Sequence, residues 1–324
     1  MLDYGGIIMN SITEILSITY PIFQGGMGNI SNAPLTAAVS EAGGLGTIGC
    51  GTMTPEEVEK IIIETKERTD KPFAINIPIT VSPYTKQLVE LAIKHEVKAV
   101  SLSAGNPSPL IPVLHEHNIK VIAIVAAVKH AMKAEQAGAD ILVAEGFEAA
   151  GINSSLELTT FTLIPQIVKH VNIPVVAAGG IGDGKGFAAA LMLGAQGVQM
   201  GTRFIATKEA PFHDEYKRKI LQASENETMI VGRSVGRVRR VLKGEYAEKI
   251  LQHEKEGMTL EQFNEKTSEI YHIKGAIEGD FQQGYVNSGQ IAGLIQDIPT
   301  VKELITTMMK EAEHQIKHVY QSFF

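Results

Sequence analysis

Short apolar runs recur along the first two thirds of the chain, and half of them end in glycine. The runs span residues 21–27, 44–51, 73–79, 99–105, 120–126, 140–146, 174–180 and 197–202. Because polar and apolar positions do not alternate within them, the runs are typical of parallel strands that are buried on both faces. Stretches with helical periodicity lie between them, for example at 55–69 and 129–139.

Eight strand–helix units in a row predict an α/β fold, namely a (β/α)8 TIM barrel. A doubly wound sheet is the alternative architecture. No change in composition divides the eight runs into two halves, which favours the closed barrel. The length of 324 residues suits one barrel that carries an insertion.

The character of the sequence changes after the eighth run. Residues 205–284 are rich in charged residues with helical spacing, and they contain no run typical of a buried strand. We therefore expect a barrel made of residues 12–204 and 285–324. Residues 205–284 should form a small helical insertion that covers the barrel mouth and bounds the substrate pocket. The run NSGQIAGLI (287–295) is expected to begin a final helix that returns to the barrel.

Composition and charge narrow the function classes. The formal net charge of −7 argues against nucleic acid or anionic membranes as the main partner. Cys50 is the only cysteine, so an internal disulfide is excluded, which fits a reducing compartment. No apolar run reaches the roughly 18 residues of a membrane span, and residues 1–10, which should precede the fold, lack a secretory signal. We expect a soluble cytoplasmic protein.

Glycine is concentrated where the seventh and eighth predicted strands end. The two segments are AAGGIGDGKG (177–186) and GVQMGTRF (197–204). This is the usual phosphate site of the fold, because backbone N–H groups and a helix N-terminus face the anion there. Glycine lets the backbone approach closely, and Thr202 adds a hydroxyl donor. The alternative is that these glycines only form tight turns.

Two further motifs match known signatures without their structural context. GLGTIG (44–49) has the spacing of a dinucleotide-binding fingerprint, but its glycines lie inside an apolar run and the next helix begins too late. GRSVG (232–236) has the spacing of a hydrolase nucleophile elbow. Ser234 would be the nucleophile and His253 or His272 the base, but no further core strands follow to carry a triad. Both interpretations are therefore disfavoured.

Polar side chains at other strand ends add candidates. Asn76 ends the third strand, where its amide offers a donor and an acceptor to a flat heterocycle. Ser103 and Asn106 follow the fourth strand, and turn capping is an equal alternative for Asn106. We expect Cys50 to be a buried core residue. We expect most of the histidines to be exposed. Four arginines form a basic run that could bind an anionic substrate: Arg233, Arg237, Arg239 and Arg240. Such a run is more often simply a basic face that is exposed to solvent.

Several motifs follow one another in a fixed order: YPIFQGGMG, AAVSEAGGLGTIG, KPFAINI, AEGFEAAG, IPVVAAGGIGDG, GVQMGTRF and GQIAGLI. In this order they resemble the nitronate monooxygenase (2-nitropropane dioxygenase) family, which includes the type II enoyl-acyl-carrier-protein reductases. FQGGMG and GQIAGLI are closer to the reductases, and GRSVGRVRRVL is closer to the monooxygenases. The resemblance implies an FMN-dependent TIM-barrel oxidoreductase.

The resemblance also implies the binding partners. The substrate would be a nitronate or an enoyl thioester, NADH or NADPH could be the electron donor, no metal is implied, and a homodimer is one arrangement that fits. The implied FMN-binding residues are Gly25, Gly26, Met27, Asn76, Glu145, Ala150, Gly179, Gly180, Gln199, Met200, Gly201 and Thr202. The last six of them would hold the ribityl phosphate.

The chain departs from the family in AEGFEAAGINSS (144–155). The family usually reads E-A-G-G-H there, and its histidine handles protons, whereas this chain has Ala150 for a glycine and Ile152 for the histidine. Ile152 cannot transfer a proton, and Asn153 could only orient a substrate. We therefore assign no catalytic residue and expect slow turnover of neutral nitroalkanes and enoyl thioesters.

Three functions stay open at this point. The first is oxidation of nitronates or NAD(P)H through the flavin, and the second is NAD(P)H-dependent reduction of enoyl thioesters. The third is flavin binding with little turnover, because the usual histidine is absent.

Overall fold

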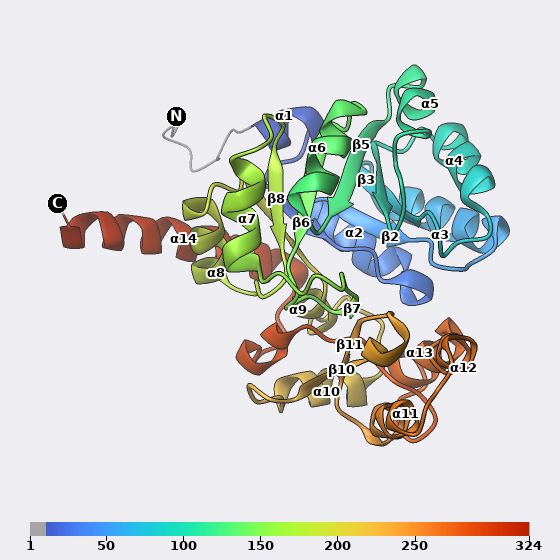
Figure 1. Cartoon of the computed structure of the whole chain (residues 1–324). Helices are drawn as coiled ribbons and strands as arrows, with labels where there is room; N and C mark the ends of the chain where they lie inside the picture. The colour runs from blue at the N-terminus through green and yellow to red at the C-terminus, as the bar shows by residue number, and fades with distance from the viewer. Residues whose placement is uncertain (1–10, 324) are drawn as a thin grey trace.

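The computed structural model describes residues 11–323, and its centre is a closed barrel of parallel strands (Figure 1). The strands are β1 (Ile22–Gln24), β2 (Gly46–Gly49), β3 (Phe73–Pro78), β4 (Ala99–Ser103), β5 (Lys120–Val125), β6 (Ile141–Glu145), β8 (Val175–Ala178) and β9 (Gly197–Met200). From β2 to β9 each strand pairs with the next of this set, β9 pairs with β1, and a bridge between Phe23 and Leu45 joins β1 to β2. The predicted TIM barrel is confirmed, with a strand in every predicted run. The expectation for residues 1–10 falls outside the described residues.

Helices cover the outside of the barrel. They are α2 (Ala33–Glu41), α3 (Pro55–Arg68), α4 (Thr85–Lys94), α5 (Ile111–Glu116), α6 (Val128–Gln136), α7 (Thr160–Val168), α8 (Gly184–Met192) and α14 (Val301–Phe323). The last helix, α14, packs between α8 and α2 and so completes the ring. Its predicted start at residues 287–295 is wrong. That run forms the 3-10 helix η3 (Gln290–Leu294), and Pro299 then disfavours helical backbone before α14.

The two ends of the barrel differ. At the amino-terminal end, α1 (Ser11–Leu16) buries Ile12 and Leu16 against the residues inside the barrel. Residues 205–284 lie at the opposite end, over the carboxyl ends of the strands (Figure 1). The second end is where a barrel of this type carries its chemistry. No helix within residues 11–323 is long and apolar enough to cross a membrane.

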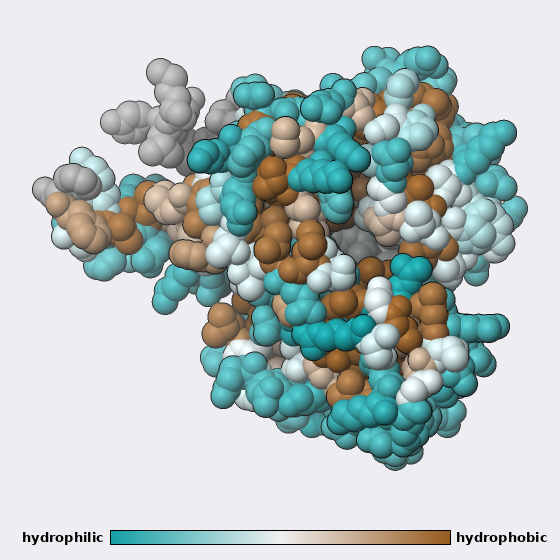
Figure 2. Space-filling view, viewed as in Figure 1, coloured by the Kyte–Doolittle hydropathy of each residue, from teal (hydrophilic) through white to brown (hydrophobic). Residues whose placement is uncertain are grey.

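We call residues 205–284 the cap. Its elements are α10 (Asp214–Leu221), β10 (Thr228–Val231), the 3-10 helix η2 (Arg233–Val235), β11 (Arg239–Leu242), α11 (Glu245–Lys255), α12 (Leu260–Lys266) and α13 (Glu269–Ala276). The expectation that this segment lacks a buried strand is wrong, because β11 is buried along its whole length. Two arginines begin β11, which is why the strand does not stand out as apolar. In Figure 2 the outer side of the cap is mostly hydrophilic, and apolar residues gather near the barrel.

The cap is joined to the barrel by backbone pairing. The strand β7 (Gly151–Ile152) lies in the loop after β6, and β11 pairs with it in antiparallel fashion. Ile152 stands opposite Arg239, and the backbone N–H of Asn153 donates to the carbonyl oxygen of Val238 at 2.8 Å. The loop that lacks the family histidine is therefore an edge strand of the cap sheet.

Candidate functional site

A cavity of about 1210 Å³ lies between the mouth of the barrel and the cap. Alternation along the strands decides which residues form its floor, since residues two positions apart point the same way. A buried layer inside the barrel includes Phe23, Ala74, Ile122, Val143 and Val176. The residues two positions further along these strands line the cavity: Gly25, Asn76, Ile124, Glu145 and Ala178. Small-ligand sites usually measure about 300–1,000 Å³, so this cavity has room for a cofactor and a substrate together.

The structure brings together every residue for which the sequence predicts a cofactor contact. All of them line this one cavity: Gly25, Gly26, Met27, Asn76, Glu145, Ala150, Gly179, Gly180, Gln199, Met200, Gly201 and Thr202. Ser103 and Asn106 line it too. Their convergence on one cavity is a structural finding, and their contact with a cofactor stays a prediction.

The glycines after β8 and β9 differ in what they permit. Gly179 and Gly180 have φ values of +99° and +75°, a region that L side chains rarely adopt. A Cβ on Gly179 would also lie 2.9 Å from the carbonyl oxygen of Gly146. Gly201 has an ordinary φ of −113°, and a Cβ there would meet no atom within 4 Å. The backbone at Gly201 therefore borders the open space of the cavity.

Two polar side chains are already partly engaged. The hydroxyl of Thr202 accepts the N–H of Gly289 at 2.9 Å, so its hydrogen is left to donate to a ligand. The Nδ2 of Asn76 lies 3.2 Å from the hydroxyl of Ser101 and 3.3 Å from that of Ser103. Asn76 thus uses its donor within the barrel and presents its carbonyl oxygen as the acceptor for a ligand.

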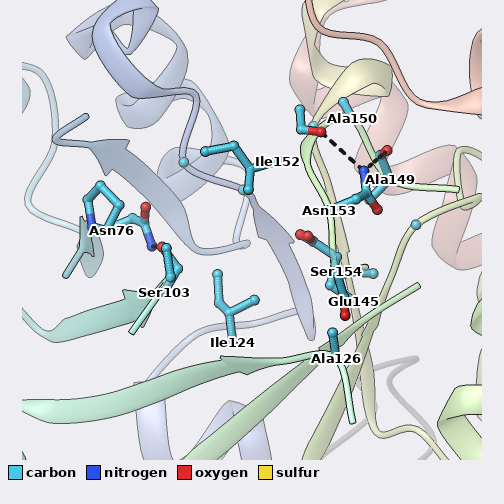
Figure 3. A pocket seen from close by; sticks show the side chains of 18 of the residues that line it. Asn76, Ser103, Ile124, Ala126, Glu145, Ala149, Ala150, Ile152, Asn153 and Ser154 are labelled. Carbon is cyan, nitrogen blue, oxygen red and sulfur yellow. Dashed lines mark hydrogen bonds between the residues drawn. The ribbon is translucent and has the colours of Figure 1, made fainter. Parts of the chain in front are cut away.

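The loop after β6 offers the cavity an apolar side chain. Ile152 is 51 % exposed and projects into the cavity between Asn76 and the loop (Figure 3). Asn153 donates through Nδ2 to the carbonyl oxygens of Ala149 at 3.0 Å and Gly151 at 3.1 Å (Figure 3). Both N–H donors of that amide serve the loop itself, so only its oxygen could orient a substrate.

The expectation that the four arginines form a face exposed to solvent is wrong for Arg239 and Arg240. Both are buried in β11. Arg240 donates from Nε and Nη2 to the carbonyl oxygen of Phe147 at 3.1 and 2.9 Å, which braces the loop after β6. Arg239 donates from Nη1 to the hydroxyl of Tyr285 at 2.9 Å. Paired hydrogen bonds of this kind explain why arginine, normally exposed, is tolerated inside a strand.

The other two arginines of the run are exposed and face different surroundings. Arg233 forms an ion pair with Glu157, with 2.7 Å between Nε and Oε1. Arg237 lies on the rim of the cavity. Of the two exposed arginines, Arg237 is therefore the one placed to meet an anionic ligand, and the buried Arg239 also lines the cavity.

A titrating carboxyl group lies on the floor of the cavity. Burial raises the pKa of Glu145 from its ordinary value of 4.5 to about 7. Figure 3 shows its side chain beside Ala126 and Ser154, below the loop. Cys50, in contrast, is fully buried as expected, and burial raises the pKa of its thiol, so it stays a protonated core residue.

The cap contributes an acid–base pair to the cavity that the sequence pattern did not place there. Glu269 and His272, both on α13, line the cavity, and His272 is only 2 % exposed, an exception to the expectation that most histidines are exposed. The available signal was the spacing Glu-x-x-His in SEIYHIK, which places both side chains on one face of a helix. Nothing in the sequence near them points to the loop after β6, which lies over 100 positions earlier in the chain.

The two disfavoured motifs have structural roles. In GLGTIG, a Cβ on Gly46 would lie 2.0 Å from the carbonyl oxygen of Thr36, so this glycine lets α2 pack on β2. In GRSVG, Ser234 donates to the buried carboxylate of Glu254 at 2.9 Å, and within residues 11–323 no hydrogen bond joins it to a histidine. The geometry supports neither a dinucleotide fingerprint nor a hydrolase nucleophile.

Comparison with known proteins gives consistent matches over nearly the whole chain. The family model described as "Nitronate monooxygenase" matches residues 9–83 and 77–311. FabK from Thermotoga maritima has the same fold with a TM-score of 0.92 and 42 % identity, covering 97 % of this chain and 99 % of that one. A (3aS,4S,5R,7aS)-5-hydroxy-7a-methyl-1-oxo-octahydro-1H-indene-4-carboxyl-CoA dehydrogenase of Mycobacterium tuberculosis is 34 % identical, over 93 % of this chain and 95 % of that protein. A probable nitronate monooxygenase of Staphylococcus saprophyticus is 33 % identical, over 93 % and 97 %.

Proposed function

The chain belongs to the nitronate monooxygenase family of oxidoreductases, and from that premise we infer that it binds FMN on the floor of its cavity and passes electrons through it. The observation that carries this proposal is the convergence of all the predicted contact residues on one cavity. FMN, when bound, would accept a hydride or electrons from one substrate and return them to another. NADH or NADPH is the proposed donor for this cycle, beside nitronates.

The residues present fit this cofactor. Gly25 and Gly26 leave the wall after β1 without side chains, which suits a flat ring, and the carbonyl oxygen of Asn76 offers an acceptor to a ring N–H. The open backbone at Gly201 and the hydroxyl of Thr202 would hold the phosphate. Ile152 adds an apolar surface that keeps water away from the reacting atoms.

Gly201→Asp tests the cofactor assignment most cleanly. The aspartate side chain fits without backbone strain, because φ is ordinary and the space is open, but its charge would meet the phosphate. We expect this variant to fold like wild type by circular dichroism and to purify colourless. Gly201→Ala is the matched control and should keep its flavin. Full FMN content in Gly201→Asp would contradict the phosphate site, and extraction of FAD from wild type would contradict the choice of FMN.

Enoyl-thioester reduction is a second candidate. It is favoured by the motifs that resemble the enoyl reductases and by a relative that is named for a thioester substrate. FabK is 42 % identical to this chain, and the mycobacterial relative is named for a carboxyl-CoA substrate. The cavity also extends along the rim to Asn106 and Lys133, which leaves room for an elongated substrate. Consumption of NADH or NADPH with a crotonyl thioester, compared with anaerobic flavin reduction by a nitronate, separates the two candidates.

The third candidate, a flavin-binding protein with little turnover, rests on Ile152 alone. It predicts a coloured protein whose flavin is reduced by neither NADH, NADPH nor a nitronate. Reduction by any one of these under anaerobic conditions would exclude it.

A further inference from the structure

The cap places an imidazole and a carboxylate side by side in the cavity wall. His272 Nδ1 lies 3.3 Å from Glu269 Oε2, and the two residues are three positions apart on α13. The imidazole also stacks on the ring of Tyr285, with 5.4 Å between centroids and 13° between planes. Glu269 in turn accepts the backbone N–H of Asn29 in η1 (Gly28–Ile30) at 3.4 Å. The pair is therefore fixed against the loop after β1, beside the predicted flavin contacts.

Glu269 determines which nitrogen of His272 carries the hydrogen. Burial opposes ionisation of this carboxyl, but the hydrogen bond from His272, the charges of His272 and Arg239, and the N–H of Asn29 outweigh it, so the pKa of Glu269 is lowered. An ionised carboxylate only accepts hydrogen bonds. Nδ1 must then be the protonated nitrogen, and Nε2 keeps its lone pair.

The lone pair of Nε2 is only weakly engaged. Its neighbour is Nδ2 of Asn287 at 3.4 Å, about as far away as Glu269 is from Nδ1, but this amide is uncharged and holds the ring less strongly than a carboxylate does. Asn287 lines the same cavity and also lies against Gly151, where a Cβ would be 3.6 Å from Asn287 Cγ. His272 therefore reaches the cavity one amide away from Gly151 and Ile152, the position at which the family carries its histidine.

We propose that His272, oriented by Glu269, is the general base of this cavity and takes the part of the histidine that the loop lacks. This inference rests on the proposed function. It revises the expectation of an aprotic site, because that expectation considered the loop alone.

The proposed step transfers one proton from the substrate to His272, and no electrons pass to the cofactor. In a neutral nitroalkane the bond between Cα and its hydrogen breaks, the electron pair moves into the nitro group, and the product is the nitronate. The proton goes to Nε2 of His272. The resulting imidazolium is stabilised by the Glu269 carboxylate, and the nitronate is then in the form that a flavin oxidises.

Three other groups set the charge around the imidazole. Glu269 on its own helix favours the imidazolium. The guanidinium of Arg239 in β11 opposes it, and its charge is shared with the hydroxyl of Tyr285 and the oxygen of Asn287. Tyr285 itself is neutral, because burial raises the pKa of its hydroxyl. The carboxylate is the nearest of these charges to the ring.

A comparison of nitroethane with its pre-formed nitronate tests the proposal on the flavin-loaded enzyme. A positioned base is worth about 10²–10⁴-fold in rate. His272→Gln should therefore lower kcat/KM for nitroethane at least about 100-fold, and it should lower nitronate turnover far less. Glu269→Gln should lower the nitroethane rate less. His253→Gln, on the exposed side of α11, is the matched control and should change neither rate.

The double variant Ile152→His/His272→Gln is the control for a loss of activity caused by misfolding. It should recover at least about tenfold of the nitroethane rate lost in His272→Gln, because it restores a base at the family position. A readout that needs no turnover is the ring tautomer. Long-range proton–nitrogen NMR of the protein should show a hydrogen on Nδ1 of His272 in wild type, and this signal should weaken in Glu269→Gln.

The outcomes separate this inference from the proposed function. If His272→Gln lowers nitroethane and nitronate turnover equally, or if wild type carries the hydrogen on Nε2, the inference is overturned. It is also overturned if wild type oxidises the nitronate but not nitroethane, and the proposed function then stands. If the flavin is reduced by neither nitronate, NADH nor NADPH, the proposed function itself fails.

Discussion

Replacing Glu145 by glutamine should stabilise the flavin-free protein at alkaline pH and not at acid pH. The carboxyl stands on the cavity floor, where burial raises its pKa from 4.5 to about 7. Below pH 4.5 it is protonated in both the folded and the unfolded chain, so the neutral glutamine gains nothing. As the pH rises from 4.5 to about 7, the carboxyl ionises in the unfolded chain but stays protonated in the folded chain, so wild type loses stability over this range that Glu145→Gln keeps.

The size of the effect follows from the gap between the two pKa values. Each pH unit of that gap corresponds to about 1.4 kcal/mol, so a rise from 4.5 to about 7 gives about 3 kcal/mol at about pH 8 and above. This is an upper value, because Glu145 borders an open cavity and water can reach part of the carboxyl. A gain of about 1–3 kcal/mol is the expected result.

The assay is urea unfolding of the flavin-free proteins, followed by circular dichroism at several pH values from about 5 to 8. Glu148→Gln is the matched control. It lines the same cavity, but its carboxylate accepts the N–H of Thr160 at 2.9 Å and the hydroxyl at 3.0 Å, so this variant should lose stability. A difference between Glu145→Gln and wild type that stays constant with pH, or that grows as the pH falls, would refute the reasoning.

Two further predictions concern the loop and the rim. Ile152→His should raise the nitroethane rate, because it places a second possible base at the family position; an unchanged rate would show that this position does not reach the reacting carbon. Arg237→Gln should raise KM for NADPH by up to about fivefold, the value of an exposed ion pair, and raise KM for NADH less, with kcat unchanged in steady-state assays. Equal effects on both donors would show that Arg237 does not meet the additional phosphate.

The barrel and its floor could be predicted from the sequence because both depend on local pattern. A parallel strand buried on both faces must be continuously apolar, and such runs occur at each of the eight strands. The end of each strand then lies at the mouth by the geometry of the fold, so Asn76 and Gly201 could be assigned to one site from the pattern, whereas Glu145 was assigned through the family resemblance alone. No long-range information was needed for this part.

The cap could not be predicted in the same way. β11 begins with Arg239 and Arg240, whose burial depends on acceptors far away in the chain, such as the carbonyl oxygen of Phe147. β7 is only two residues long and becomes a strand through its partner. The closeness of His272 to Gly151 likewise depends on how the cap sits on the barrel, which no local spacing encodes.

The missing loop histidine and the base in the cap are therefore two parts of one arrangement. Ile152 stands opposite Arg239 in the paired strands, and Arg239 hydrogen-bonds to Asn287, which contacts His272. Ile152 itself carries no charge and does not titrate beside this group. A histidine there would instead bring a second titrating ring beside Arg239 and His272. The effects of Ile152→His and His272→Gln on nitroethane turnover should therefore not add, since each change alters what the other residue faces.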